Sequence, residues 1–447
     1  MKISLKSIIK NLSKVKINIK NKNMVALATS ALALVLVAVI VIISVAGSNS
    51  VITKNGDLMK GVSGARVKNE KITDGFEEVY ANFCLDLLVN TTKETNIAFA
   101  PSNILSAIAL MGHGAEHNTK LEIEKTLGMP SLEIGKQLSN LENRIKYNDK
   151  NAAGLRYSNN ILLNNATLFG VKPKFLKDNA KYFGLGVDRI SYSNEKEVKE
   201  VFQKYAEETS YISAINYKLE KLQYMNIFSN AAFTAKWEDE VSADDNGHDI
   251  FQGNNATTEA NYFKFIADSY IKGGAYQGFT KKLEGNYTFV GLITNEYSQG
   301  SYYSSDMIFT ELAETGQFKN ILSTATDDEE VAVWLPIYNN NSTATKTITF
   351  TSTLKNMGIK TALDKTATFN NMVEVSDNLH ISEVAASGNV TLCAAGVCDT
   401  RSNQKKSNAK KVDECENKLA FNREFSYLII DNKTGLPIYC AIVRNLD

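Results

Sequence analysis

An uncharged stretch of 23 residues, from Met24 to Ala46, restricts the topology of this chain more than any other segment. It is mostly Ala, Val, Leu and Ile, and about 20 such residues cross the hydrocarbon core of a bilayer as a helix. Residues 1–23 contain seven lysines and no acidic side chain. Because basic residues gather on the cytoplasmic side of membrane helices, we expect residues 1–23 to be a basic cytoplasmic segment and residues 24–46 a transmembrane signal anchor.

A cleavable signal peptide is the alternative, since Ser44-Val45-Ala46 would suit a signal peptidase. The apolar run is longer than the usual signal-peptide core of about 7–15 residues, which favours the uncleaved anchor. Both interpretations export the bulk of the chain. The expected location is the cell membrane, single-pass, with the remaining residues extracytoplasmic, or secretion after cleavage.

The overall composition is that of a globular protein without a charge bias. Of the 447 residues, 49 are Lys or Arg and 49 are Asp or Glu, so the formal net charge is zero and no nucleic-acid partner is expected. At 44% hydrophobic residues the chain can bury a core. Residues 47–68 are polar and predict a juxtamembrane linker, whereas residues 69–447 contain no Pro/Gly-rich break and are expected to form one domain.

Hydrophobic periodicity changes along this domain. Apolar side chains predict helices over 75–90, 104–111 and 118–127. Short β-rich runs follow at 287–294 and 331–335, and a hairpin is predicted from 425–430 and 437–443 around a five-residue turn. Because helices dominate early and strands late, the predicted class is α+β.

Two histidines have surroundings that could suit a catalytic site. His113-Gly114-Ala115-Glu116-His117 matches the inverted zinc-protease pattern, but Gly114 inside the metal helix and the capping residues Asn118-Thr119 favour a helix-to-helix junction. His380 has no motif around it and is interpreted as a strand-edge histidine. No phosphate-binding loop, dinucleotide fingerprint or nucleophile elbow occurs. We therefore expect no catalytic residue, no metal, no cofactor and no enzyme activity.

The segment from Leu392 to Ala420 is long, polar and rich in Lys, Asn and Ser, although it lies between strand-like runs. A loop of this length in a compact domain is usually functional or disordered. Its lysines could attract an acidic partner or a trypsin-like protease, and a solvated excursion is the alternative. Export would permit disulfides, and the odd number of cysteines leaves at least one without a partner in the same chain. The five cysteines are Cys84, Cys393, Cys398, Cys415 and Cys440.

Five sequence blocks, in order and at similar intervals, resemble the serpin family from about residue 69 to the end. The C-terminal block is the most specific. The blocks are Asn96–Pro101 with Asn103 and Ala107; Gly114-Ala115, Asn118-Thr119 and Leu127-Gly128; Phe233–Trp237 with Glu238; Met357–Ile359 with Phe369 and Met372; and Phe421–Phe425 through Asp431–Gly435 to Ile442–Asn445. The chain thus resembles a membrane-anchored, prokaryote-like serpin.

The resemblance implies a serpin fold of three β-sheets and about nine helices with an exposed reactive loop. In this family a protease cleaves the loop, which then inserts as a new strand into the main sheet and carries the enzyme along as an acyl adduct. The positions that match the hinge are Gly396, Val397, Cys398 and Asp399. The bait bond falls at Lys410–Lys411, and a lysine would suit a trypsin-like pocket with a carboxylate. The implied partner is a target protease, and a monomer is expected.

The hinge departs from the inhibitory pattern, which has acidic residues before the glycine and small residues after it. Alternate side chains of an inserted strand would point inward, among them Asp399, Arg401 and Asn403. Burying charges costs several kcal/mol, so slower or less complete insertion is expected.

The residues that hold the main sheet closed also differ. Ala100 and Asn103 stand where the family usually has serines, and Ala386 stands near its histidine. The hydrogen-bond network of that region is expected to be rebuilt or absent.

A disulfide between Cys398 and Cys415 would join the two ends of the bait loop and limit insertion until reduction. Two functions stay open. One is inhibition of a trypsin-like protease by the suicide-substrate route. The other is a non-inhibitory serpin, with a degenerate hinge, that acts as an extracellular binding or structural protein; a simple protease substrate is a minor alternative.

Overall fold

The computed structural model describes most of the chain after residue 50. The described residues are 51–67, 71–91, 93, 95–150, 152–166, 169–209, 219–220, 222–239, 241–339, 347–398, 412 and 414–446, without the side chains of 242–248 and 398. The predicted cytoplasmic segment and signal anchor, residues 1–23 and 24–46, lie outside this description. Within it, no helix has both the length and the apolar character needed to span a bilayer. Residues 52–447 form one compact unit.

Eight α-helices occur among the described residues, where about nine were expected. The three helices predicted from periodicity are present. The helices are α3 (Asp74–Asn90), α4 (Pro101–Gly114), α5 (His117–Leu127), α6 (Ser131–Ile145), α7 (Pro173–Asp178), α8 (Glu195–Glu208), α9 (Asp306–Glu314) and α10 (Thr351–Met357), with short turns η1 (Asn179–Phe183), η2 (Ile321–Thr324) and η3 (Thr361–Leu363). Local signals explain the ends: the Thr73 side chain accepts a hydrogen bond from the Phe76 amide at the start of α3, and Gly128 ends α5 in the left-handed conformation.

The described strands form three larger sheets and a two-stranded ribbon. The main sheet has the order β1 (Gly56–Asp57), β4 (Gly186–Ile190), β3 (Gly154–Asn164), β5 (Met225–Lys236), β19 (Gly396–Cys398), β18 (Thr391–Cys393) and β15 (Tyr338–Asn339), with β17 (Ile381–Asn389) also paired to β5 and β16 (Ile348–Thr349) paired to β17. The second sheet has the order β13 (Ala325–Thr326), β8 (Ser269–Lys272), β9 (Tyr276–Leu283), β10 (Tyr287–Thr294), β21 (Phe425–Asp431), β22 (Leu436–Val443) and β2 (Ile97–Phe99).

The third sheet has the order β20 (Asn417–Ala420), β14 (Val331–Pro336), β7 (Thr257–Ile266) and β6 (Ser242–Gln252), and the ribbon pairs β11 (Glu296–Ser298) with β12 (Ser301–Tyr302). The predicted C-terminal hairpin is confirmed as β21 and β22, which pair from Phe425↔Val443 to Asp431↔Leu436. The α+β class is confirmed as well.

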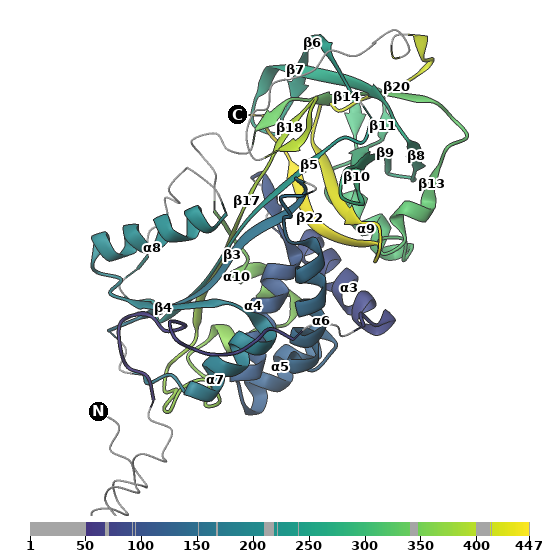
Figure 1. The fold of residues 1–447 in the computed structure, drawn as a ribbon. Coiled ribbons are helices and arrows are strands. Elements are labelled where there is room, and N and C mark those ends of the chain that lie inside the picture. The colour runs from purple at the N-terminus through teal and green to yellow at the C-terminus, as the bar shows by residue number, and fades with distance from the viewer. Residues whose placement is uncertain are drawn as a thin grey trace, which may run out of the picture. The chain divides into compact units, whose positions relative to one another are not determined.

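Helices cover both faces of the main sheet. Figure 1 shows α4, α5 and α6 grouped together and α8 separate from them beyond β3 and β4. Helix α4 is buried except for His113, which explains the mostly apolar sequence from Ile104 to Met111. Helix α8 is amphipathic and packs through Phe202 and Tyr205 onto Phe228 of β5, in a small cluster separate from the main core. Helices therefore cover both faces of the main sheet, whose strand β17 leads to the predicted loop.

Residues 52–67 are part of the domain and not the free linker expected for 47–68. Ile52 forms an antiparallel bridge with Val171, β1 adds an edge strand to β4, and Leu58 is fully buried. Arg66 forms an ion pair with Glu142 of α6. The polar composition concealed these contacts, because Leu58 is the only core residue of this segment, and Ile52, Met59 and Val62 pack partly buried against the core.

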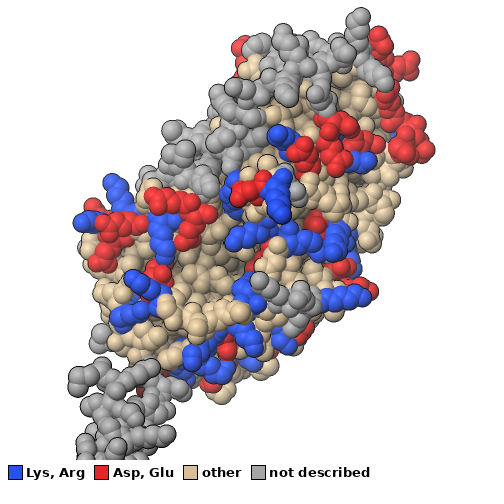
Figure 2. Space-filling model, viewed as in Figure 1, with Lys and Arg blue, Asp and Glu red and all other residues tan. Residues whose placement is uncertain are grey.

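The charged surface is mixed in sign. Figure 2 shows acidic and basic side chains interspersed over the visible face, in keeping with the formal net charge of zero.

Candidate functional site

The strand that leads into the loop closes the middle of the main sheet. Strand β17 runs parallel to β5, and eight residue pairs join them, from Ile381↔Met225 to Asn389↔Ala232. Small side chains in β17 allow close packing on both faces, with Ala386 in the main core and Ala385 in the cluster beneath α8. We call this β5–β17 contact the seam.

After the C-terminal end of β17, the chain turns back into the main sheet. Strands β18 and β19 form a tight hairpin, and β19 lies between β18 and β5, antiparallel to both. Val397 is paired with Leu392 on one side and with Ala235 on the other, and all three are fully buried. Residues 396–398, where the predicted hinge begins, are thus already a central strand of the sheet.

Gly396 is required at this turn. Its φ is +140°, in a region that favours glycine, and a Cβ there would overlap the carbonyl oxygen of Ala235. The assignment of Gly396 as a hinge glycine from sequence therefore has a local steric reason.

The Trp237 side chain forms a hydrogen bond to the same hairpin. The Trp237 Nε1–H donates to the carbonyl oxygen of Cys393 at 3.0 Å. The ring itself is buried against Phe263, Phe265 and Phe289, with centroid distances of 6.3, 5.8 and 5.5 Å. This packing fixes the position of the hydrogen bond, so the hairpin is anchored to the aromatic core.

The upper part of the seam is held by side-chain amides. The Asn230 Oδ1 accepts hydrogen bonds from the Ser387 hydroxyl at 2.8 Å and from the Asn389 Nδ2 at 2.9 Å. The Asn230 Nδ2 donates to the Thr209 Oγ1 at 2.9 Å, which connects the seam to the end of α8. Between Ser387 and Asn389, Gly388 leaves room for the backbone of Ala98.

The hydrogen-bond network that we expected to be rebuilt or absent is present further along the sheet, where asparagine side chains form it. The Ser229 hydroxyl donates to the Asn159 Oδ1 at 2.8 Å, and the Asn159 Nδ2 donates to the Asn103 carbonyl oxygen at 2.8 Å. These bonds join β5, β3 and α4. The Asn103 side chain is 1% exposed, and its Oδ1 and Nδ2 have no hydrogen-bond partner among the described residues.

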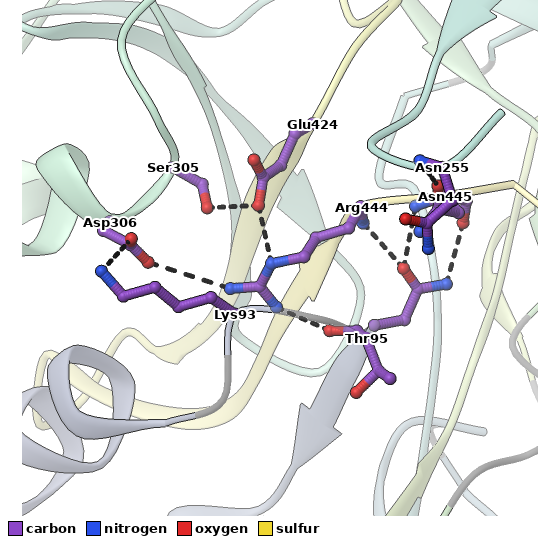
Figure 3. A network of polar contacts seen from close by, with 9 residues as sticks. Lys93, Thr95, Asn255, Ser305, Asp306, Glu424, Arg444 and Asn445 are labelled. Carbon is purple, nitrogen blue, oxygen red and sulfur yellow. Dashed lines mark hydrogen bonds and ion pairs between the residues drawn. The ribbon is translucent and has the colours of Figure 1, made fainter. Parts of the chain in front are cut away.

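The far end of the loop is anchored separately. Val412 and Cys415 are buried with Ala332, and β20 runs parallel to β14. Beyond it, Glu424 accepts hydrogen bonds from the Ser305 hydroxyl and from the Arg444 Nε at 2.8 Å (Figure 3).

The guanidinium of Arg444 is 1% exposed and is the centre of this anchor. It also donates to the Thr95 carbonyl oxygen at 2.6 Å and lies 3.9 Å from Asp306, which pairs with Lys93 (Figure 3). Burial lowers the pKa of Arg444, and Glu424 and Asp306 oppose that effect. The C-terminal strand, the chain after the loop and the start of α9 are therefore tied to one buried cation.

The structure places only part of the predicted site. Gly396 and Val397 lie in β19, and Cys398 ends it. Asp399 and the bait bond at Lys410–Lys411 lie outside the described residues.

Of the predicted Cys398–Cys415 disulfide, only the second cysteine has a described side chain. Cys415 is a free, buried thiol whose sulfur lies 3.2 Å from the Glu330 carbonyl oxygen and 3.3 Å from that of Asn417. Because the Cys398 side chain is not described, the pairing stays a prediction.

The histidine contexts are structural. His113 lies in the last turn of α4, and its Nε2 lies 3.0 Å from the Asp178 Oδ2, whereas His117 begins α5. The helix-to-helix junction is confirmed, since the two histidines are on different helices. His380 lies just before β17, and its ring packs at a tilt against that of Tyr224, with 5.2 Å between the centroids. In the part of the chain that is described, no three His, Cys, Asp or Glu side chains could hold a metal ion.

Sequence reasoning missed the insertion of β19 and the asparagine network of the seam. A short polar run flanked by apolar residues, such as Ser158-Asn159-Asn160 and Ser229-Asn230, was the available signal. Buried amides in a strand imply partners of the same kind nearby.

In the class of protein that this geometry defines, the chain after the strand β17 turns back as a further strand, β19, into a sheet that the β5–β17 contact closes. The family model described as Serpin (serine protease inhibitor) matches residues 78–446. The chain therefore belongs to the serpin family, whose members are generally protease inhibitors and not enzymes.

Individual relatives are distant. Neuroserpin of Homo sapiens is 23% identical over 343 residues, which cover 72% of this chain and 78% of that protein, and neuroserpin of Gallus gallus is 22% identical over 304 residues, 64% of this chain and 70% of that protein. The fold is similar to the native thermophilic serpin tengpin, with a TM-score of 0.76 and 22% identity over 88% of this chain and 100% of that chain. It is also similar to thyroxine-binding globulin, with a TM-score of 0.67 and 18% identity over 83% and 99%.

Proposed function

We propose that this serpin inhibits a trypsin-like serine protease as a suicide substrate, with its bait bond between Lys410 and Lys411. The observation that carries the proposal is β19. Since three loop residues already lie between β5 and β18, further insertion extends an existing strand and does not have to begin a new one. Starting a strand between two others is the step that fixes the register, and here Val397 has fixed it.

Insertion has a defined path. For the strand to extend beyond β19, β5 and β17 must separate; eight residue pairs join them now. An inserted strand would pair with both of them, antiparallel, so one line of hydrogen bonds is replaced by two. This net gain is the driving force that would distort a protease still attached to the loop.

The test is incubation of the full chain with trypsin, followed by a denaturing gel. We expect a covalent complex and, in the cleaved protein, a thermal midpoint above that of the intact protein. Lys410→Ala with Lys411→Ala should lose the complex, and the matched variant Lys405→Ala with Lys406→Ala should keep it. Cleaved loop without a complex, and without a gain in thermal midpoint, would refute inhibition.

A non-inhibitory binding or structural role is the second candidate, and the register of β19 favours it. Val397 pairs with Ala235 and Leu392, so two residues further along Asp399 would face Phe233 and Val390, both fully buried. An uncompensated carboxylate in that position costs several kcal/mol. Thyroxine-binding globulin, solved in complex with thyroxine, has this fold and binds a small molecule.

Substitutions at the head of the loop separate the two roles. If charge burial limits insertion, Asp399→Ala with Arg401→Ala should raise the fraction of protease trapped by about tenfold or more, since 1.4 kcal/mol corresponds to a factor of about 10. Thr400→Ala, on the opposite face of the inserted strand, is the control and should change little. If the trapped fraction of protease is the same in all three proteins, Asp399 does not limit insertion.

We also propose that the domain is exported, on the anchor at residues 24–46 or after its cleavage. The seven lysines before the apolar run support this orientation. Protease added to intact cells should digest the domain if it is outside the cytoplasm, and should leave it intact if it is inside.

A further inference from the structure

Two cysteines meet where the first helix of the domain packs on its last strand. Cys84 of α3 and Cys440 of β22 are both fully buried, and their sulfur atoms lie 3.4 Å apart although 356 positions separate them in the sequence. The contact is held in register by a neighbour: the Tyr80 hydroxyl, one helical turn earlier, donates to the Pro437 carbonyl oxygen at 3.0 Å. The two sulfurs therefore face each other because the helix and the strand dock in one way.

Neither thiol has a role in the proposed inhibition. Cys440 pairs with Phe99 and Leu428 in the second sheet, and the hinge belongs to the main sheet. A change at this pair should therefore leave the hinge unaffected, although Ala98 of the neighbouring strand β2 also lies against Gly388 in the seam.

We propose that Cys84 and Cys440 form a disulfide that joins the first helix of the domain to its last strand. Both are free thiols in this structure, and a disulfide needs their sulfurs to approach from 3.4 Å to about 2.05 Å. The two thiols lose two protons and two electrons, and a disulfide oxidant such as glutathione disulfide accepts them and leaves as two thiols. An exported protein would meet such an oxidant.

Burial decides when the bond can form and break. Burial raises the pKa of the Cys84 thiol well above its usual range, and the contact with Cys440 adds to this. Because the thiolate is the reactive species, exchange should be slow once α3 is docked. The bond should therefore form while the helix is still undocked, and should afterwards resist reductants until the domain opens.

The expected consequence is stabilisation. A cross-link between positions so far apart in the sequence removes many conformations from the unfolded chain. Reduction should lower the thermal midpoint by several degrees.

The test is thiol mapping of the full chain. The protein is exposed to glutathione disulfide in urea just below its unfolding midpoint, alkylated under denaturing conditions and digested for mass spectrometry. We expect one peptide pair that contains Cys84 and Cys440, is two hydrogens lighter than the free peptides together, and disappears on reduction. Full alkylation of both cysteines without reduction would overturn the proposal.

Variants provide an independent readout. In Cys84→Ala and in Cys440→Ala the thermal midpoint should no longer fall when reductant is added, whereas Cys415→Ala should keep the fall. A fall of equal size in Cys84→Ala would also overturn the proposal. If the alanine variants do not fold, the peptide map of the unaltered protein decides alone. Loss of inhibition is not expected in any of these variants, so this test and that of the proposed function can fail separately.

Discussion

At the scale of single residues, Glu142 links the protonation state of the domain to its stability. Its side chain is 4% exposed and pairs with Arg66. Burial raises its pKa to about 7, and Arg66 and Tyr157 oppose this only in part. The folded protein thus holds this proton more tightly than the unfolded chain, where the ordinary value is 4.5. The resulting stabilisation is complete below about pH 4.5 and is lost as the pH rises through about 7.

Glu142→Gln should remove this dependence. Between about pH 5 and pH 8, the free energy of unfolding of the unaltered protein should fall by roughly 2–3 kcal/mol relative to that of the variant. Urea unfolding across this range measures the difference. Glu133→Gln, an exposed carboxylate on the same helix, is the control, and a pH slope like that of Glu142→Gln in this control would contradict the assignment.

At the scale of elements, the seam between β5 and β17 depends on Asn230. Its side chain accepts from Ser387 and Asn389 and donates to Thr209, so three buried polar groups depend on one amide. A buried group that loses its partner costs about 1–3 kcal/mol. The proposed loop insertion would require the seam to open, so Asn230 would set part of its barrier.

Asn230→Ala should lower the stability of the seam more than Ser387→Ala, which removes only one of the two donors to Asn230. We expect losses of about 2–4 kcal/mol and about 1 kcal/mol respectively in the free energy of unfolding. Hydrogen exchange of the β17 amides should become faster in the same order. Equal exchange in both variants would show that the amide does not hold the seam.

At the scale of the whole molecule, the N-terminal boundary of the domain lies near residue 52 and not at 69. Leu58 is fully buried and β1 adds to the main sheet. Arg66 pairs with the buried Glu142, which would be left without this cation if the segment were absent.

A chain shortened to begin at residue 69 should therefore be less stable than one that begins at residue 52, by about 3–5 kcal/mol. Thermal and urea unfolding of the two chains test this. Leu58→Ala in the longer chain should account for about 2–3 kcal/mol of the loss. Equal midpoints for the two chains would mean that residues 52–67 contribute nothing to folding.

Local patterns predicted much of the architecture. The helices α3, α4 and α5 and the hairpin of β21 and β22 follow from spacing, caps and turn residues within about 20 positions. Gly396 was identified by its position, and its φ of +140° explains why no other residue would serve. The pairing of β19 with β5 was not predicted, because residues 396 and 236 are 160 positions apart and nothing local specifies their contact.

What the sequence alone determined is the α+β class, the main helices, the serpin resemblance and the position of the loop, because each depends on neighbouring residues or on blocks in order. Only the tertiary structure decided that the loop begins as an inserted strand, that residues 52–67 belong to the core, that asparagines close the seam and that Cys84 faces Cys440. Those contacts join segments far apart in the chain, and their partners are selected by the packing of the whole domain.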